Sequence, residues 1–373
     1  MAAAKKAGIV PETEEKKPLR IGILGVGGIA GAHIRSYQKM PEDAKVVAGA
    51  DIIKGKARKR LDQLGEPEAL AFDSAEELLK SVELDAVSVC AYNTSHAELT
   101  IAALEAGLPV LLEKPMCVTM EEAAAILRAE KKAGKIVSVG FQPRYDPNSK
   151  KIKEIVQSGE LGQIYYVQTG GGRRRGIPGN TFIEEKTAGM GALGDIGCYG
   201  LDMPLNSLGY PKPLTVSASK FDLFGTNPKL YSEAARFDVD DFAVALIRLE
   251  GGITLDFRMS WAMHLDTMGP TFFLGDKAGL KVQPSGSGAW DGRVGGLTLY
   301  HDAFGDPTET PIHFSTRDVD LFFEKVKAFV TAVQTNGPAP IPTSEIIYNQ
   351  AIVSGILTSA REQAEIKIEI PAV

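Results

Sequence analysis

Hydrophobic residues in the first third of the chain follow two alternating patterns. Short continuous apolar runs, typical of buried strands, are each followed by a segment with apolar residues three and four apart, typical of amphipathic helices. Strands are expected at 19–24, 45–50, 86–91, 109–112 and 136–139, and helices at 29–38, 55–64, 75–80, 96–106 and 120–132. Ser74 and Thr119 are placed to cap two of these helices, Ser74 in a capping box with Glu77. The alternation predicts a parallel sheet wrapped by helices, with ligands at the carboxyl ends of its strands.

The pattern changes after about residue 142. One helix, at 149–157, is followed by strand-like segments at 164–170, 214–221, 241–249, 253–261, 271–274 and 279–282, and helices at 318–334 and 344–363 close the chain. Glu250-Gly251-Gly252 is typical of a hairpin turn. Because few helices separate these strands, we expect a second, largely antiparallel sheet with one open face. An apolar open face would be covered most simply by a second subunit.

The first predicted strand runs into a glycine turn with the pattern Gly-x-Gly-x-x-Ala. Gly25 can take the backbone angles of a sharp turn, Gly27 lets a pyrophosphate approach the backbone, and Ala30 lets the helix lie close to the strand. Free N–H groups around Gly28 and Ile29, at the start of the helix, favour phosphates. The turn therefore predicts a dinucleotide-binding Rossmann domain.

Asp51 follows the second strand, 24 residues after Gly27. Its carboxylate can accept hydrogen bonds from the adenosine ribose hydroxyls and would repel a 2′-phosphate. NAD is therefore favoured over NADP, although Lys54, Lys56 and Arg58 keep NADP open as a cofactor.

Composition excludes several classes of protein. The 373 residues suffice for two domains. The net charge of −6 argues against nucleic acid as a partner, and no apolar run approaches the ~18 residues of a membrane span. Cys90, Cys117 and Cys198 lie far apart without metal-ligand spacing, so we predict no metal site and expect a reducing compartment, the cytoplasm. Residues 1–18 are expected to be a disordered lead-in without a signal-peptide core.

Two strand ends carry polar residues where a nicotinamide would lie over the sheet. Asn93 and His96 follow the strand at 86–91, and Glu113 and Lys114 follow the strand at 109–112. Burial and the positive nicotinamide both disfavour an ammonium group, so we expect a lowered pKa for Lys114. Such a lysine can take a proton from a carbinol or give one to a carbonyl. A solvated surface lysine is the alternative.

A second group of polar residues follows residue 194. In a helix, Asp195, Tyr199 and Asp202 would share one face. Gly197 and Gly200 each cost a helix about 1 kcal/mol relative to Ala, so we expect a ring or a backbone to approach closely there. Asp195 and Tyr199 can both bind a substrate hydroxyl. The alternative is a helix N-cap at Asp195 and a packed ring at Tyr199.

These motifs occur in order over roughly residues 19–370, and in this combination the chain resembles the Gfo/Idh/MocA family of glucose–fructose oxidoreductase, inositol dehydrogenase and rhizopine-catabolism proteins. The carrying segments are the glycine turn, the Glu113-Lys114-Pro115 triplet and Asp195-Ile196-Gly197-Cys198-Tyr199. The resemblance implies a Rossmann domain followed by an α/β domain whose open, mostly antiparallel sheet commonly forms the oligomer interface.

The resemblance also implies hydride transfer at a sugar-like carbon. Lys114 takes the position of the family's lysine, Asp195 that of its carboxylate partner, and Asn93 and His96 match the segment that lines the cofactor. Inositol-dehydrogenase-like members have a histidine where this chain has Tyr199. The acid/base therefore stays open between Lys114, Tyr199 and the pair.

Further residues are candidates for the substrate pocket. Arg144 and Tyr145 follow the last strand of the first domain, and Arg174 lies in an arginine triplet that could hold an acidic group or form a solvated loop. Trp261 and His264 follow a strand of the second sheet. An indole face suits the C–H face of a sugar ring, while a packed core position for Trp261 and a surface position for His264 are the alternatives.

We therefore predict an α/β protein with an NAD-binding Rossmann domain at 19–141 and a substrate-binding and oligomerisation domain at 142–373, whose C-terminal helices can pack back on the first domain. The predicted activity is NAD-dependent oxidation of a secondary hydroxyl of a sugar, glycoside or polyol, most narrowly at C3 of a glycoside. A redox-assisted glycosidase and a non-enzymatic NAD-binding regulator remain alternatives. We expect a homodimer or homotetramer with no nucleic-acid or membrane partner.

Overall fold

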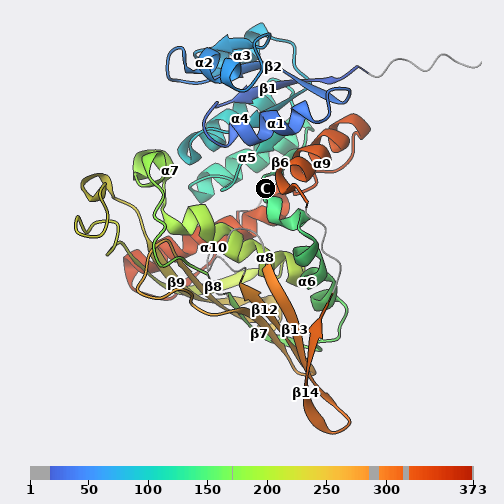
Figure 1. The fold of residues 1–373 in the computed structure, drawn as a ribbon, viewed down its shortest axis with the longest axis vertical. Helices are drawn as coiled ribbons and strands as arrows, with labels where there is room; N and C mark the ends of the chain where they lie inside the picture. Colours follow the sequence, from blue (N-terminus) through green and yellow to red (C-terminus); the bar gives the residue numbers. More distant parts are fainter. Residues whose placement is uncertain (1–16, 170, 285–293, 314–318, 372–373) are drawn as a thin grey trace, which may run out of the picture.

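The computed structural model describes residues 17–169, 171–284, 294–313 and 319–371. The expected lead-in at 1–18 thus lies almost entirely outside the described residues. Within them the chain forms two sheets, which lie one above the other in Figure 1 with helices between and around them.

The upper sheet is parallel, with strand order β3-β2-β1-β4-β5-β6 within the described chain. Both β1 and β4 are buried almost throughout, as expected of strands covered on both faces. The predicted Rossmann-type sheet is therefore confirmed. The strands are β1 (Leu19–Leu24), β2 (Ala44–Ala50), β3 (Leu70–Phe72), β4 (Ala86–Val89), β5 (Val110–Leu112) and β6 (Val137–Val139). The helices are α1 (Ala30–Gln38), α2 (Lys56–Gln63), α3 (Ala75–Ser81), α4 (His96–Glu105) and α5 (Met120–Ala133).

Local side-chain bonds begin two of these helices as their sequences indicate. The Ser74 hydroxyl accepts the backbone N–H of Glu77 at 3.1 Å at the start of α3, which is one of the two bonds of the capping box predicted there. Thr119 and Glu122 form a reciprocal capping box at the start of α5, which ends at Gly134 with a φ of +60°. β3 was not predicted, because an edge strand of three residues carries little hydrophobic pattern.

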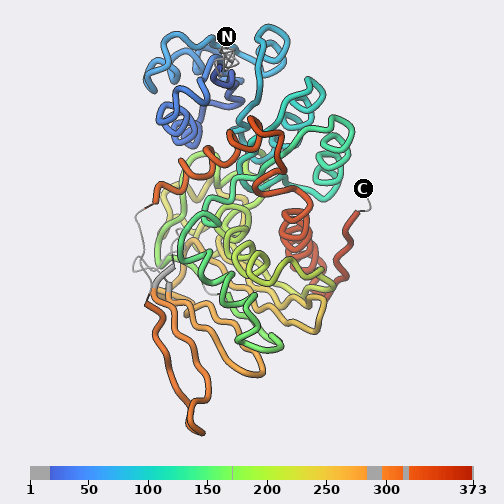
Figure 2. Tube along the Cα trace, turned by 90° about the vertical axis from the view of Figure 1, so that its right-hand side faces the viewer, coloured from blue at the N-terminus to red at the C-terminus, as the bar shows by residue number. Residues whose placement is uncertain are grey.

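The lower sheet is antiparallel except where β7 runs parallel to β10, so the prediction of a largely antiparallel sheet is confirmed. In the described chain its order is β14-β13-β12-β11-β7-β10-β9-β8-β15. The hairpin of β13 and β14 projects away from the rest of the molecule (Figures 1 and 2) and was not predicted, since β14 is polar and contains two prolines. The strands are β7 (Ile164–Thr169), β8 (Pro213–Phe221), β9 (Phe242–Leu249), β10 (Thr254–Ser260), β11 (Thr271–Gly275), β12 (Ala278–Pro284), β13 (Val294–Ala303), β14 (Asp306–Ile312) and β15 (Ile366–Lys367).

Helices α6 (Pro147–Gln157), α8 (Cys198–Leu208) and α10 (Thr343–Glu362) lie on the upper side of this sheet, between it and the first domain (Figure 1). Burial alternates along β9: Ala245 and Ile247 are buried on the helix side, while Leu246 is 43% exposed on the other. Helix α9 (Leu321–Thr335) returns to the upper domain, where Phe329 packs with Ile21 and Ile34 in one core.

Candidate active site

The amine and the carboxylate that were expected to converge do meet between the two domains. Lys114 follows β5, and its Nζ lies 3.0 Å from Oδ1 and 2.9 Å from the backbone oxygen of Asp195. Both side chains are mostly buried. The Lys114–Pro115 peptide bond is cis. The second domain therefore supplies the anion that faces the lysine of the first.

Asp195 lies in a short π-helix, Leu193–Gly197, that continues into α8. Asp240 holds the start of this helix, because its carboxylate accepts the backbone N–H groups of Gly191 and Leu193, each at 2.8 Å. Gly191 is required here, since a Cβ would overlap the Asp240 carbonyl oxygen. π-Helical turns are rare and frequently occur at functional sites.

The two glycines of this segment have the role predicted for them. A Cβ on Gly197 would lie 3.2 Å from the ring of Phe257, and one on Gly200 would lie 2.7 Å from the Met259 methyl group. Both partners come from β10. The glycines therefore let the helix that carries Asp195 lie directly on the second sheet.

The charge state of Lys114 differs from the expectation. Burial lowers the pKa of the Lys114 ammonium, but the neighbouring Tyr199, Asp195 and Cys198 outweigh burial and raise this pKa above its usual value. Burial raises the pKa of the Tyr199 phenol above its usual range and that of the Cys198 thiol to about 12, so both are neutral at pH 7. Asp195 is then the anion that keeps Lys114 charged. The predicted lowering of the Lys114 pKa was wrong for the chain without a bound cofactor, because the prediction from sequence left out the carboxylate of Asp195 that contacts Lys114.

Tyr199 completes the group. Its ring lies under Lys114, with Nζ 4.9 Å from the ring centroid, and its hydroxyl accepts a hydrogen bond from Gln142 Nε2 at 2.7 Å. Phe141 packs edge-on against the same ring. Gln142 and Phe141 were not predicted. Both lie within three residues of the end of β6, and the polar Gln142 near a strand end was a signal that could have found it.

The glycine turn is shaped to admit a dinucleotide. Gly25 has a φ of +89°, and a Cβ there would lie 2.7 Å from the backbone of Ala91. A Cβ at Gly28 would meet open space. Helix α1 begins after Ile29 with no side-chain cap and no acidic residue in its first turn, and Ala30 is fully buried against the sheet. The backbone N–H groups at this helix start thus suit phosphates.

Asp51 stands beside that turn at the end of β2. It is 8% exposed, and Oδ2 accepts the Val26 N–H at 3.2 Å. Oδ2 also pairs with Lys56 at 2.9 Å. The carboxylate is therefore held next to the glycine turn, where an adenosine ribose would lie in a Rossmann domain.

The side chains of Asn93 and His96 contact backbone carbonyl oxygens. Asn93 Nδ2 donates to the Ala188 oxygen at 2.9 Å, which ties the first domain to the short helix α7 (Glu185–Ala188) of the second. His96 is buried, with Nδ1 2.6 Å from the Pro115 oxygen, and burial lowers its pKa. It thus supports the backbone just beyond Lys114.

Glu113 lies in an ionic cluster beneath the sheet end. Its carboxylate contacts Lys325 from α9 and His33 Nε2 from α1, the latter at 2.7 Å. Glu113 is 4% exposed and Lys325 1% exposed. We had expected Glu113 at the cofactor, but its carboxylate is turned inward and neutralised there.

Arg144 is also committed to partners. Its guanidinium forms a two-pronged contact with Asp202, at 2.8 and 2.9 Å, and reaches Glu345 at 2.7 Å and Tyr210. Asp202 therefore faces Arg144, while Asp195 faces Lys114. Tyr145, next in the chain, is half-buried, and burial raises its pKa to about 12.

Trp261 is 0% exposed and directly follows β10. Its indole Nε1 donates to Asp195 Oδ2 at 3.0 Å. Of the two interpretations given for Trp261, the packed core position is confirmed, because a fully buried ring presents no face to a sugar. Arg174 and His264 are exposed, and His264 packs near the ring of Phe224.

Comparisons with known proteins agree with this architecture. Residues 19–141 match the family described as oxidoreductase family, NAD-binding Rossmann fold, and residues 149–281 match the GFO/IDH/MocA C-terminal domain. D-glucoside 3-dehydrogenase of Escherichia coli (strain K12) is 30% identical over 359 residues, which cover 94% of this chain and 98% of that protein.

Two further likenesses are partial or structural. Inositol 2-dehydrogenase of Serratia proteamaculans (strain 568) is 37% identical over 146 residues, 39% of this chain and 43% of that protein. The crystal structure of aldose-aldose oxidoreductase from Caulobacter crescentus, complexed with glycerol, aligns with 94% of this chain and all of that one, with a TM-score of 0.76 at 22% identity. At that identity the likeness shows the fold alone. In the described residues, no helix is long and apolar enough to cross a membrane, and no cluster of potential metal ligands occurs.

Proposed function

The chain belongs to the Gfo/Idh/MocA family of oxidoreductases, and we propose that it oxidises a secondary hydroxyl of a sugar, glycoside or polyol with NAD. The observation that carries the proposal is the contact between Lys114 Nζ and Asp195 Oδ1, which joins the two domains beside the strand ends of the first.

The residues around the glycine turn fit the dinucleotide. Gly25, Gly27, Gly28 and the start of α1 would hold the pyrophosphate, and Asp51 would accept the ribose hydroxyls and disfavour a 2′-phosphate. When bound, NAD supplies the acceptor for the hydride that leaves the carbinol carbon. The protein's own groups then have to bind the reacting oxygen and move its proton.

Lys114 and Tyr199 are suited to bind that oxygen. A lysine ammonium has three N–H groups, and two are directed at Asp195. Tyr199 accepts from Gln142, which leaves its own proton to donate. In the proposed oxidation Lys114 acts as the neutral amine, which the positive charge of a bound nicotinamide would favour. Two N–H groups of Lys114 remain on Asp195, and the Nζ lone pair accepts the carbinol proton as the hydride leaves the carbon. Tyr199 donates a hydrogen bond to the same oxygen, and Asp195 orients Lys114 and stabilises the ammonium that forms.

The full-length relative supports a narrower substrate class. D-glucoside 3-dehydrogenase aligns with nearly the whole chain, which supports C3 of a glycoside as the reacting carbon and a 3-keto glycoside as the product. We also propose a cytoplasmic location, since the three cysteines are free and buried.

We further propose that the open face of β8 and β9, on which Phe221 and Leu246 are exposed, is an interface between subunits.

The test incubates the protein with NAD⁺ and a panel of glycosides, sugars and polyols, followed by absorbance at 340 nm and by mass spectrometry of the products. We expect NADH and a product two mass units lighter than the substrate. Cleavage of the glycosidic bond without net NADH would favour the redox-assisted glycosidase instead, and NAD binding without turnover would favour a regulator.

Substitution then tests the assigned lysine. Lys114→Met should lower turnover by the ~10²–10⁴-fold typical of acid/base groups. Lys131→Met removes an exposed lysine from the last turn of α5 and is the matched control. Turnover of Lys114→Met within a few-fold of the control would contradict the role.

A further inference from the structure

Asp195 has a second partner, which lies on the side away from Lys114. While Oδ1 faces Lys114 Nζ at 3.0 Å, Oδ2 accepts the indole N–H of Trp261, also at 3.0 Å. The two oxygens of one carboxylate are thus held by groups from different domains. A carboxylate with both oxygens engaged in this way has little freedom to rotate.

Trp261 is itself fixed in place. Its backbone N–H donates to the Asp241 oxygen at 2.8 Å. Its ring packs edge-on against Phe237, with centroids 6.5 Å apart, and Phe237 packs in the same way against Tyr231. The indole is fully buried. Its N–H direction is therefore set by packing.

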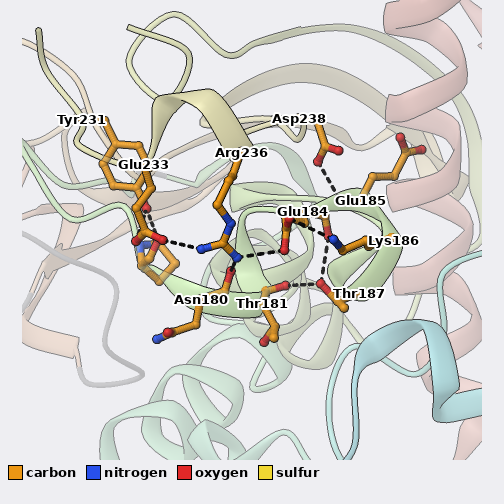
Figure 3. A network of polar contacts seen from close by, with 11 residues as sticks. Asn180, Thr181, Glu184, Glu185, Lys186, Thr187, Tyr231, Glu233, Arg236 and Asp238 are labelled. Atoms are coloured by element: carbon orange, nitrogen blue, oxygen red, sulfur yellow. Dashed lines mark hydrogen bonds and ion pairs between the residues drawn. The ribbon is translucent and has the colours of Figure 1, made fainter. Parts of the chain in front are cut away.

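The segment that packs on Trp261, residues 231–238, is held in place by the polar network in Figure 3. Arg236 binds Glu184 and Glu233, at 2.9 and 2.7 Å, and the Tyr231 hydroxyl donates to the Pro178 oxygen at 3.0 Å. These bonds join residues 178–187 to residues 231–238. The network thus holds Phe237 against the indole from outside.

An indole N–H donates a hydrogen bond and cannot accept one. Next to a carboxylate it restricts orientation without competing for the proton that Lys114 handles. We propose that Trp261 is a positioning residue, whose N–H holds the Asp195 carboxylate in the orientation that places Lys114 against the reacting oxygen. The expected effect of Trp261 on turnover rests on the proposed function. The orientation of the Asp195 carboxylate does not depend on it, because it can be observed in the protein without substrate.

Trp261→Phe tests the proposal, because it keeps a buried ring and removes the N–H. A hydrogen bond to a charged group accounts for roughly 10- to 100-fold in an equilibrium or rate. We expect kcat to fall by about that factor, with KM and the Kd of NAD changed less than about threefold. The matched control is Phe273→Leu, a fully buried ring on β11, which β7 separates from β10.

An isotope effect separates positioning from a general loss of structure. With substrate deuterated at the reacting carbon, slower hydride transfer in Trp261→Phe should raise the isotope effect on kcat. A smaller fraction of folded enzyme would leave it unchanged, as we expect for Phe273→Leu. A kcat within twofold of wild type with the wild-type isotope effect would overturn the proposal.

A crystal structure of Trp261→Phe decides the matter independently of any substrate. We expect the Asp195 carboxylate to rotate and its Oδ1 to leave Lys114. An unchanged contact would overturn the inference, even if no sugar proved to be a substrate. Failure of the wild-type protein to oxidise any member of the panel would overturn the proposed function, while the crystal structure would still decide the role of Trp261.

Discussion

Removing Lys325 should destabilise the first domain strongly, because this side chain neutralises a buried carboxylate. Lys325 is 1% exposed and contacts Glu113, which is 4% exposed. Burial raises the pKa of Glu113, but Lys325 and His33 outweigh burial and hold it far below its usual range. Lys325→Met leaves this carboxylate with His33 alone.

The expected cost follows from burial. Breaking a buried ion pair by removing one partner costs about 3–5 kcal/mol, since the other charge stays out of water. Glu113→Gln in the Lys325→Met background removes the orphaned charge, so the double variant should be more stable than Lys325→Met. The two substitutions should therefore show a coupling energy well above 1 kcal/mol.

The cost should also depend on pH. Burial and Lys325 both lower the pKa of His33. Without Lys325 one of these causes is gone, so the pKa of His33 is lowered less in the variant than in wild type. A histidine with a lowered folded-state pKa costs stability at low pH, because the unfolded state binds the proton more readily, and this cost is smaller in the variant. Lys325→Met should therefore cost more at pH 8 than at pH 5.

Urea unfolding followed by circular dichroism at both pH values measures these effects. Lys327→Met is the control, because Lys327 is exposed on the same helix and its loss should change stability by less than about 0.5 kcal/mol. A cost for Lys325→Met below about 1 kcal/mol at pH 8, or strict additivity with Glu113→Gln, would refute the pairing of these groups in solution.

Two further predictions concern the glycine turn and a second buried acid. Gly25→Ala should abolish NAD binding measured by calorimetry, because φ is +89° and the Ala91 backbone leaves no room for a methyl group. Gly28→Ala should retain the fold, because its methyl group would face open space. Equal losses of unfolding free energy in the two variants would contradict this difference between the two glycines. Burial above all, with help from Asp222, raises the pKa of Asp241 to about 6. This acid favours the folded state at low pH and loses that effect as the pH rises from 4 to 7, so Asp241→Asn should gain stability relative to wild type over that range, by up to about 3 kcal/mol. A pH-independent difference in unfolding free energy would show that Asp241 does not titrate in this way.

Structural features that depend on residues close together in the chain could be predicted from the sequence. The strand Leu19–Leu24 has the predicted bounds, and the caps at Ser74 and Thr119 use partners three residues away. Gly197 and Gly200 indicated a close approach, which the Phe257 ring and the Met259 methyl group make. These features follow from backbone geometry and side-chain size, which short segments of chain already contain.

Charge and orientation at the site were decided by tertiary structure. Lys114 is held charged by a carboxylate 81 residues away, and Glu113 is turned inward by a lysine 212 residues away. Trp261, for which a sugar-facing and a packed core position were both open, is buried and donates its indole N–H to Asp195. Electrostatic energies depend on distance in space and on burial, and neither is fixed by spacing along the chain. The sequence by itself therefore determined on which strands and helices most of the candidate groups lie, while only the folded arrangement decided which of them are paired, neutral or charged.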